Sequence, residues 1–368
     1  MRRDVPEIDK LVGMLCWVTD GEGVYGSIKE RPEDFIVEEI LPDGTILDIQ
    51  RPILKASGYE GLFTHFILVK KGIGNFEAVW TLAEKLRIPT SFFFYSGNKD
   101  RDALTTQRMA VWGVSPEKLL SIDLPNSIKI CSPIRELRRI HIGEHLGNRF
   151  TITIRNISPH DSRRLEQLLN ELEKRKYLPN FFGYQRFGIT RPITHYVGKF
   201  LTLKDYKKAV ITYLCAPGLT DDEVLLETKK LIMEECYQEA LRRLPKKGFL
   251  FEKIILRELI KNKYDYKRAL KRVPAYLLRM FIEAYQAYIF NKILSKVFLL
   301  GVSCIYENKI VNLPVVGYDT IIGNNNLISD IIRMIIEEEG IKREYFKNKD
   351  FPPLSVRGTL RSTVVKIS

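Results

Sequence analysis

Cysteine is scarce in this chain of 368 residues. Its five cysteines lie far apart, and no two of them form a Cys-x-x-Cys pair. An odd number of isolated thiols argues against a disulfide framework, and the missing pairs argue against a structural zinc site. The positions are Cys16, Cys131, Cys215, Cys236 and Cys304. We therefore expect a fold that is held together without cross-links or metal.

Long hydrophobic runs are missing as well. No apolar stretch approaches the roughly 18–20 residues that a membrane-spanning helix needs, and the first residues lack the apolar core of a signal peptide. We expect a cytoplasmic protein with no membrane partner. The Gly-Lys-Ser/Thr ending of a phosphate-binding loop does not occur, and no serine or cysteine has the sequence context of a hydrolase nucleophile.

Negative charge is in deficit. The chain has 58 lysines and arginines against 45 aspartates and glutamates, which gives a formal charge of +13. Such an excess favours a polyanionic partner, because cations that neutralise phosphates release condensed counterions. Many of the cations crowd between Arg135 and Lys176. A nucleic acid is thus a candidate partner, and a solvated basic surface is the alternative.

The first half of the chain has mixed secondary-structure signals. Apolar residues make up 45% of the chain, enough for a packed core, and the length suggests roughly two domains. Residues 63–70 and 149–156 are β-prone. Between them, a helix is predicted from about Phe76 to Leu86 with Asn75 as its N-cap. Its predicted apolar face carries Phe76, Val79, Trp80 and Ala83.

After about Arg191 the periodicity becomes helical. Apolar residues recur at helical spacing, and Pro-Gly and Pro-Lys-Lys-Gly sequences punctuate the pattern. The predicted helices cover residues 206–214, 221–244, 249–261, 274–299 and 327–339. The whole pattern predicts an α+β protein with a mixed first domain and a mostly helical second domain.

Residues 92–107 carry the most informative chemical pattern. An aromatic run ends at a glycine, and two carboxylates, Asp100 and Asp102, follow beside Lys99 and Arg101. A β-prone segment then leads away. This order predicts a carboxylate at the rim of a sheet among cations, where it stays ionised and can act as a nucleophile or a base. The alternative is a polar turn between two strands.

Two further segments combine aromatic with polar side chains. Residues 180–188 hold four aromatics together with Asn180, Gln185 and Arg186, which could stack on and hydrogen-bond an unpaired base. A tight turn whose aromatics fill the core is the alternative. Residues 147–150 open a strand that could present Phe150 to a flat substrate.

His141, Glu144 and His145 have the His-x-x-Glu-His spacing of one class of zinc peptidases. That motif needs a helix to place both imidazoles on one face. Gly143 lies inside the segment and β-branched residues surround it, so a strand that leads into a loop is the better interpretation. We predict no bound zinc, and a zinc peptidase stays the weaker alternative.

Together these segments resemble the TruD-type tRNA pseudouridine synthases, particularly their archaeal form. The similarity runs in the family's order over residues 28–39, 96–107, 147–150, 179–188 and 284–291. The resemblance implies a mixed-sheet pseudouridine synthase catalytic domain, residues 1–188, and a largely helical insertion domain, residues 189–356. Residues 357–368 would begin a return to the catalytic domain that we expect to be truncated.

The resemblance also implies an activity and a set of site residues. The family's enzymes detach uracil from its ribose in tRNA, chiefly at position 13 of the D-arm, and reattach it through carbon. The catalytic aspartate of the family falls on Asp100, and its conserved basic residue falls on Lys29. The expected substrate-binding residues are Phe35, Lys99, Asn148, Phe150, Asn180, Gln185 and Arg186. No cofactor, metal or obligate protein partner is implied, and a monomer is expected.

Three questions stay open at this point. Asp100 could attack the ribose C1′ or take a proton from C2′ to give a glycal, and Asp102 is a rival carboxylate. A catalytically silent RNA-binding protein of the same architecture is the alternative function.

Overall fold

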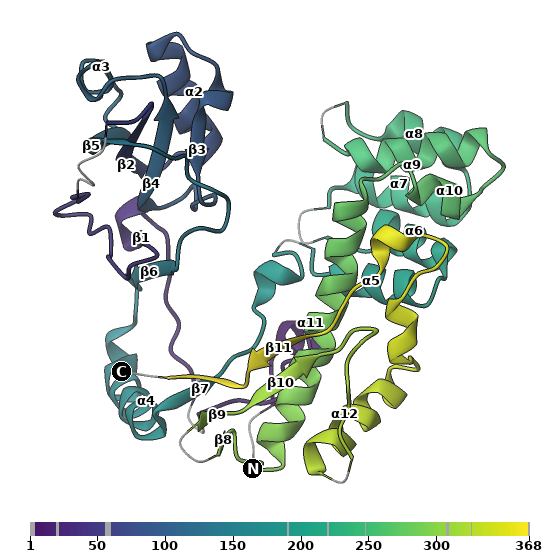
Figure 1. Cartoon of the computed structure of the whole chain (residues 1–368). Coiled ribbons are helices and arrows are strands. Elements are labelled where there is room, and N and C mark those ends of the chain that lie inside the picture. Colours follow the sequence, from purple (N-terminus) through teal and green to yellow (C-terminus); the bar gives the residue numbers. More distant parts are fainter. Residues whose placement is uncertain are drawn as a thin grey trace. The chain divides into compact units, whose positions relative to one another are not determined.

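The computed structural model describes residues 4–19, 22–55, 60–189, 191–218, 221–246, 248–306, 309–324 and 326–366. The chain forms two compact units (Figure 1). One unit comprises Gly23–Glu166, and the other comprises Met1–Glu22 together with Gln167–Ser368. The units divide the chain at other residues than the domains predicted above, whose assignment as catalytic and insertion domains stays a prediction.

The unit of residues 23–166 is built on a mixed sheet. Six of its described strands form the sheet in the order β5-β2-β4-β1-β6, and β3 pairs with β4 beside this path. Strands β1 and β4 are parallel, whereas the other pairs are antiparallel. The strands are β1 (Phe35–Ile40), β2 (Phe63–Lys71), β3 (Phe93–Tyr95), β4 (Leu104–Trp112), β5 (Ile128–Glu136) and β6 (Gly147–Ile152); the helices are α2 (Asn75–Leu86) and α3 (Pro116–Leu120). The prediction of an α+β fold is confirmed.

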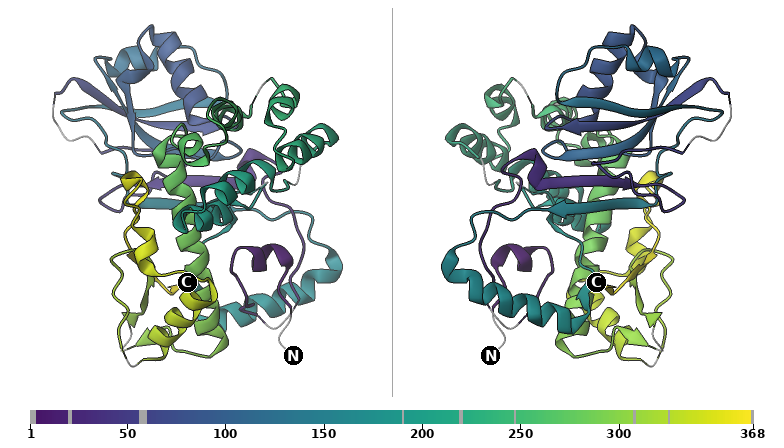
Figure 2. Two further views of the ribbon diagram at one scale, coloured as in Figure 1. Left: turned by 90° about the vertical axis from the view of Figure 1, so that its right-hand side faces the viewer. Right: turned by 90° about the vertical axis from the view of Figure 1, so that its left-hand side faces the viewer.

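Helix α2 covers one face of this sheet (Figure 2). It buries Ala78, Val79, Leu82, Ala83 and Leu86 against apolar side chains of β2, β3 and β4. The predicted placement of Phe76 and Trp80 on the buried face was wrong, since they are 69% and 57% exposed. At 100° per residue they are rotated away from the stripe that Val79, Leu82 and Leu86 form.

The start of α2 also differs from the prediction. Gly74 is the N-cap, and its amide donates a hydrogen bond of 2.8 Å to the carboxylate of Glu77. Asn75 is instead the first helical residue and is buried. Because Asn75 does not cap the helix, its side-chain amide can contact the segment that carries Asp100, as described below.

The other unit is largely helical and packs around α11 (Ala275–Leu299). The described helices are α1 (Glu7–Leu11), α5 (Thr194–Thr202), α6 (Tyr206–Cys215), α7 (Glu223–Met233), α8 (Tyr237–Arg243), α9 (Leu250–Lys261), α10 (Tyr266–Leu270) and α12 (Leu327–Glu338). Short antiparallel pairs join β7 (Tyr177–Pro179) to β12 (Val364–Lys366), β8 (Ile305–Tyr306) to β9 (Lys309–Ile310), and β10 (Asn312–Val315) to β11 (Thr359–Ser362). Helix α4 (Ser162–Arg175) spans the division between the units.

Most of the predicted helices of this unit are confirmed, with one exception. Residues 221–244 form two helices, α7 and α8, because Glu235 between them adopts a left-handed backbone conformation with φ of 59°. Helix α11 is buried on nearly all sides, and the amide of Asn291 satisfies main-chain groups of Val12 and Phe182 at 2.8–3.0 Å. In the described parts of the chain, no helix combines the length and the apolar surface that crossing a bilayer would require.

Two substitutions on α2 test this orientation of the helix. Leu82→Ala removes a fully buried side chain and should lower the free energy of unfolding by about 2–5 kcal/mol. Trp80→Ala, on the exposed face, should lower it by less than about 1 kcal/mol. Urea unfolding followed by circular dichroism measures both, and equal losses would contradict the orientation.

Candidate active site

The floor of the candidate site is formed by β1 and β6. In their antiparallel register Val37 faces Phe150 and Glu39 faces Asn148. Because side chains alternate along a strand, Phe35 lies on this same face, which is the face that α2 covers farther along the sheet. The rings of Phe35 and Phe150 meet edge to face with centroids 5.8 Å apart. Phe150 is 51% exposed, so a flat aromatic surface remains open to a substrate.

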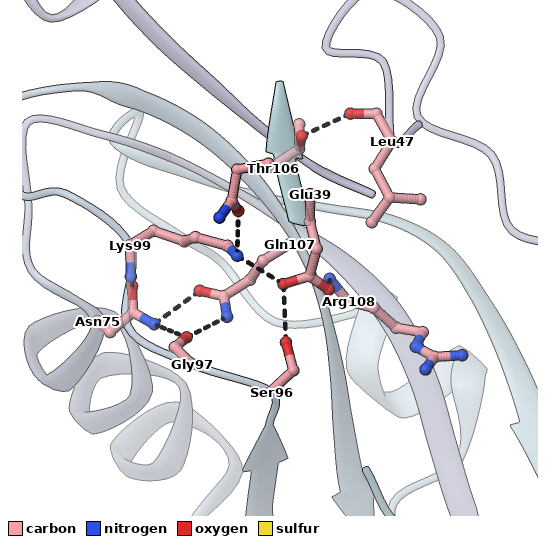
Figure 3. Close-up of polar contacts among 10 residues, drawn as sticks. Glu39, Leu47, Asn75, Ser96, Gly97, Lys99, Thr106, Gln107 and Arg108 are labelled. Carbon is pink, nitrogen blue, oxygen red and sulfur yellow. Dashed lines mark hydrogen bonds and ion pairs between the residues drawn. The ribbon is translucent and has the colours of Figure 1, made fainter. Parts of the chain in front are cut away.

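The segment between β3 and β4 carries Asp100 and is held by hydrogen bonds of side-chain amides (Figure 3). The Asn75 amide donates to the Gln107 side chain at 2.7 Å and to the Gly97 carbonyl at 3.3 Å, and it accepts from the Lys99 main-chain N–H at 3.3 Å. Gln107 also donates to the Gly97 carbonyl at 3.0 Å. Residues 97–99 are thereby tied to the first turn of α2 and to β4.

A buried ion pair joins the same segment to β1. The ammonium of Lys99 lies 2.8 Å from the carboxylate of Glu39, and their side chains are only 3% and 1% exposed. Glu39 also accepts hydrogen bonds from the Ser96 hydroxyl at 2.9 Å and from the Arg108 main-chain N–H at 3.1 Å. Lys99 donates a second bond, of 2.6 Å, to the side-chain oxygen of Asn148. The pair therefore orients Asn148 as well as the loop.

Asp100 is the carboxylate that this support presents outward. Its oxygen lies 3.1 Å from the ammonium of Lys29, and the two side chains are 38% and 31% exposed. The same ammonium lies 4.0 Å from the centre of the Phe35 ring. An accessible carboxylate with one cation and an aromatic wall beside it can act as a nucleophile or a base on a planar substrate.

Lys29 reaches this position with a strained backbone. Its φ is 61°, a left-handed conformation that costs an L-residue about 1 kcal/mol or more. The main chain around it is fixed by the paired main-chain hydrogen bonds of Ser27 and Arg155, at 2.8 and 2.9 Å. Such strain persists where the surrounding structure imposes it and is frequent at functional sites.

The comparisons with known proteins identify the family. The sequence model described as tRNA pseudouridine synthase D (TruD) matches residues 11–305. The chain belongs to the TruD family. A relative from Methanocaldococcus jannaschii, named a probable tRNA pseudouridine synthase D 1, is 35% identical over 93% of this chain and 87% of its own length. Another, from Methanopyrus kandleri, is 35% identical over 87% of this chain and 81% of its own length.

A solved structure agrees with these relatives. The crystal structure of a Methanosarcina mazei protein assigned as TruD superimposes with a TM-score of 0.83 at 27% identity. The match covers 99% of this chain and 90% of that one. The resemblance to the archaeal form of the TruD family, predicted from the sequence segments, is thus confirmed.

The structure brings together six of the nine site residues predicted from the TruD resemblance. Lys29, Phe35, Lys99, Asp100, Asn148 and Phe150 all belong to the unit of residues 23–166 and are linked by the contacts above. Their functional roles stay predictions. The ammonium of Lys99, which was expected to bind substrate, is buried against Glu39.

The remaining three predicted residues belong to the other unit. The amide of Asn180 donates to the Ser362 carbonyl at 3.1 Å, and its oxygen accepts from Arg361 at 2.7 Å. Arg186 lies 3.4 Å from Glu283, and Gln185 is exposed on the short turn Tyr184–Arg186. Asn180 is thus held by Ser362 and Arg361, and substrate contacts of Asn180, Gln185 and Arg186 all stay predictions.

The segment with the zinc-peptidase spacing is irregular, which confirms the predicted loop between β5 and β6. Glu144 forms ion pairs with Arg108 at 3.1 Å and Arg138 at 3.0 Å. Burial raises the pKa of Glu144, but the His141 amide and both arginines lower it more, so that it lies below its ordinary value. Among the described residues, no three His, Cys, Asp or Glu side chains are grouped as metal ligands.

The residues that support the candidate site were not predicted from the sequence. Glu39, Asn75, Ser96 and Gln107 are all buried and touch the Asp100 segment or its ion pair. One signal was available in the sequence. Glu39 and Gln107 are polar residues of β-prone segments, and each lies on a strand face that also carries apolar residues. Buried polar groups at such positions need partners, and those partners mark a site.

Breaking the buried ion pair should be costly. Glu39→Leu leaves the ammonium of Lys99 buried without a carboxylate, which should lower the free energy of unfolding by about 3–5 kcal/mol. The double variant Glu39→Leu/Lys99→Met should regain most of that loss, because no uncompensated charge remains. Urea unfolding of the single and double variants measures the coupling; a double variant as unstable as Glu39→Leu would contradict it.

Proposed function

We propose that this TruD family member converts a uridine of tRNA into pseudouridine, with Asp100 as its catalytic residue. The observation that carries the proposal is the pair of Asp100 and Lys29, 3.1 Å apart and accessible beside the rings of Phe35 and Phe150. The names of the relatives and the match to the TruD family support the same reaction. The formal charge of the chain, +13, favours an RNA substrate.

The reaction is an isomerisation, so atoms balance within the substrate. The C1′–N1 bond breaks, a C1′–C5 bond forms, the proton on C5 leaves and N1 gains one. Asp100 would start the sequence either by attack of its carboxylate oxygen on C1′ or by removal of the C2′ proton. Lys29 is placed to balance the charge of that carboxylate, and Phe150 offers the detached uracil a wall that neither donates nor accepts protons.

The substrate must be an unstacked nucleoside. A base that is paired or stacked in tRNA cannot reach a side chain on the face of a sheet. The uridine therefore has to flip out, at a cost of a few kcal/mol. We propose that Phe150 and Phe35 offset part of this cost by contact with the base. We further propose position 13 of the D-arm as the target, and a cytoplasmic enzyme that acts as a monomer.

Replacement of Asp100 tests the catalytic assignment. Asp100→Asn should lower the rate of pseudouridine formation by about 10³-fold or more, because the amide is neither a nucleophile nor a base. Binding of tRNA, measured by filter retention, should change little. Asp102→Asn is the matched control, since Asp102 is exposed two residues away, and it should keep the wild-type rate. Wild-type protein that binds tRNA but forms no pseudouridine would favour the catalytically silent alternative.

The target position has its own test. Purified protein is incubated with unmodified tRNA transcripts without added cofactor, and pseudouridines are mapped by chemical labelling and primer extension. A transcript with uridine 13 replaced by cytidine should gain no pseudouridine, whereas replacement of another D-arm uridine should have no effect. Modification that persists in the first transcript would refute the position but not the activity.

A further inference from the structure

Lys70 is a buried lysine next to the proposed catalytic residue that the mechanism above does not use. It is the penultimate residue of β2, and only 1% of its surface is exposed. Its neighbour Lys71 ends the same strand, is exposed and pairs with Glu33. The two lysines therefore share a strand but not an environment.

The ammonium of Lys70 is bonded to main-chain carbonyls. It donates to the carbonyl oxygen of Asp100 at 2.5 Å and to that of Ile73 at 2.8 Å. Within the described part of the chain, no carboxylate forms an ion pair with it. Lys70 thereby connects β2, the entry to α2 and the residue proposed to be catalytic.

Stability alone does not account for this arrangement. An ammonium without a carboxylate partner is expensive to bury, whereas the positions two and four residues earlier on the same face hold Leu68 and Phe66. Burial lowers the pKa of Lys70 to about 8. The charge of Asp100 raises this pKa, that of Lys99 lowers it, and that of Glu77 on α2 raises it.

The hydrogen bond from Lys70 to the Asp100 carbonyl adds a support at the residue that follows those held by Asn75 and Gln107. Asn75 and Gln107 hold residues 97 and 99, and the Lys99 side chain holds Glu39. At residue 100 the hydrogen bond from Lys70 fixes the main-chain carbonyl. The carboxylate that meets Lys29 belongs to this same residue. A shift of about 1 Å at a reacting group can slow catalysis by about 100-fold.

We propose that Lys70 is a positioning residue for pseudouridine formation: its buried ammonium holds the Asp100 carbonyl so that the carboxylate stays aligned with the ribose. The inference rests on the proposed function of Asp100. Lys70 does not itself touch substrate, since its side chain is closed to solvent and two of its three N–H donors are bonded to main-chain carbonyls.

Two variants and a matched control test the role. Lys70→Met removes the donor, and Lys70→Gln keeps an amide donor on a shorter chain. Both should lower kcat by about 10- to 100-fold with KM and the dissociation constant for tRNA changed less than about twofold. Lys71→Met, on the same strand, should keep the wild-type kcat and KM.

A pH profile separates positioning from simple destabilisation. Lys70 loses its charge near pH 8, which weakens its charge-assisted hydrogen bonds to both carbonyls, so wild-type kcat should hold below that pH and decline above it. In Lys70→Gln, which does not titrate there, this alkaline decline should disappear. Asp100, Lys99 and Glu77 are the charged groups that act on Lys70, and they are present in both proteins.

The outcomes are distinguishable from failure of the proposed function. If the wild-type protein forms no pseudouridine, or if Asp100→Asn remains active, the proposed function fails. If those results hold but either folded Lys70 variant keeps kcat within about twofold of wild type, only the inference fails. Circular dichroism identifies folded protein; if neither Lys70 variant folds, the lysine is structural and the positioning role is overturned.

Discussion

The ion pair between Lys99 and Glu39 is the interaction on which the candidate site depends. It lies under the Asp100 segment, excluded from water, and contacts three further partners: Ser96 in the loop, Arg108 on β4 and Asn148 on β6. Desolvating two charges costs several kcal/mol per ion, so such a pair adds little net stability compared with apolar residues. What it supplies is geometry. A loop that could adopt many conformations is fixed by partners that would be left buried and unpaired in any other position.

Three lysines lie close to Asp100, and each has a different environment. Lys29 is partly exposed and faces the carboxylate, Lys99 is buried and neutralised by Glu39, and Lys70 is buried against carbonyl oxygens. Of these three lysines, only Lys29 keeps part of its side chain exposed. The two buried lysines fix the main chain on both sides of Asp100. Under the proposed function, a single carboxylate has one cation for its chemistry and two for its placement.

The sequence located the residues of the candidate site better than the residues that support them. The carboxylate beside two cations was visible in residues 99–101, and helical periodicity located most of the helices after Arg191. The meeting of Lys29 with Asp100, 71 residues apart, followed from the family resemblance and not from local pattern. Phe76 and Trp80 were misplaced because large aromatic side chains suggest burial, whereas the phase of the small and branched residues decides the buried face. The buried roles of Glu39 and Asn75 depend on strand register and on loop conformation, which no short window contains.

The arginines of the site region show why formal charge alone is a weak guide to RNA binding. Arg155 donates two hydrogen bonds to Asp34 at 2.6 and 2.8 Å and thereby lowers the pKa of that carboxyl. Arg149 lies between Glu38 and Asp48, whose hydrogen bonds raise the pKa of its guanidinium. These cations fix the strands that carry Asn148 and Phe150, and they would have to leave a carboxylate before they could neutralise a phosphate. Affinity for tRNA should therefore depend on basic residues that lack such partners, while the paired arginines contribute to the shape of the surface that the RNA meets.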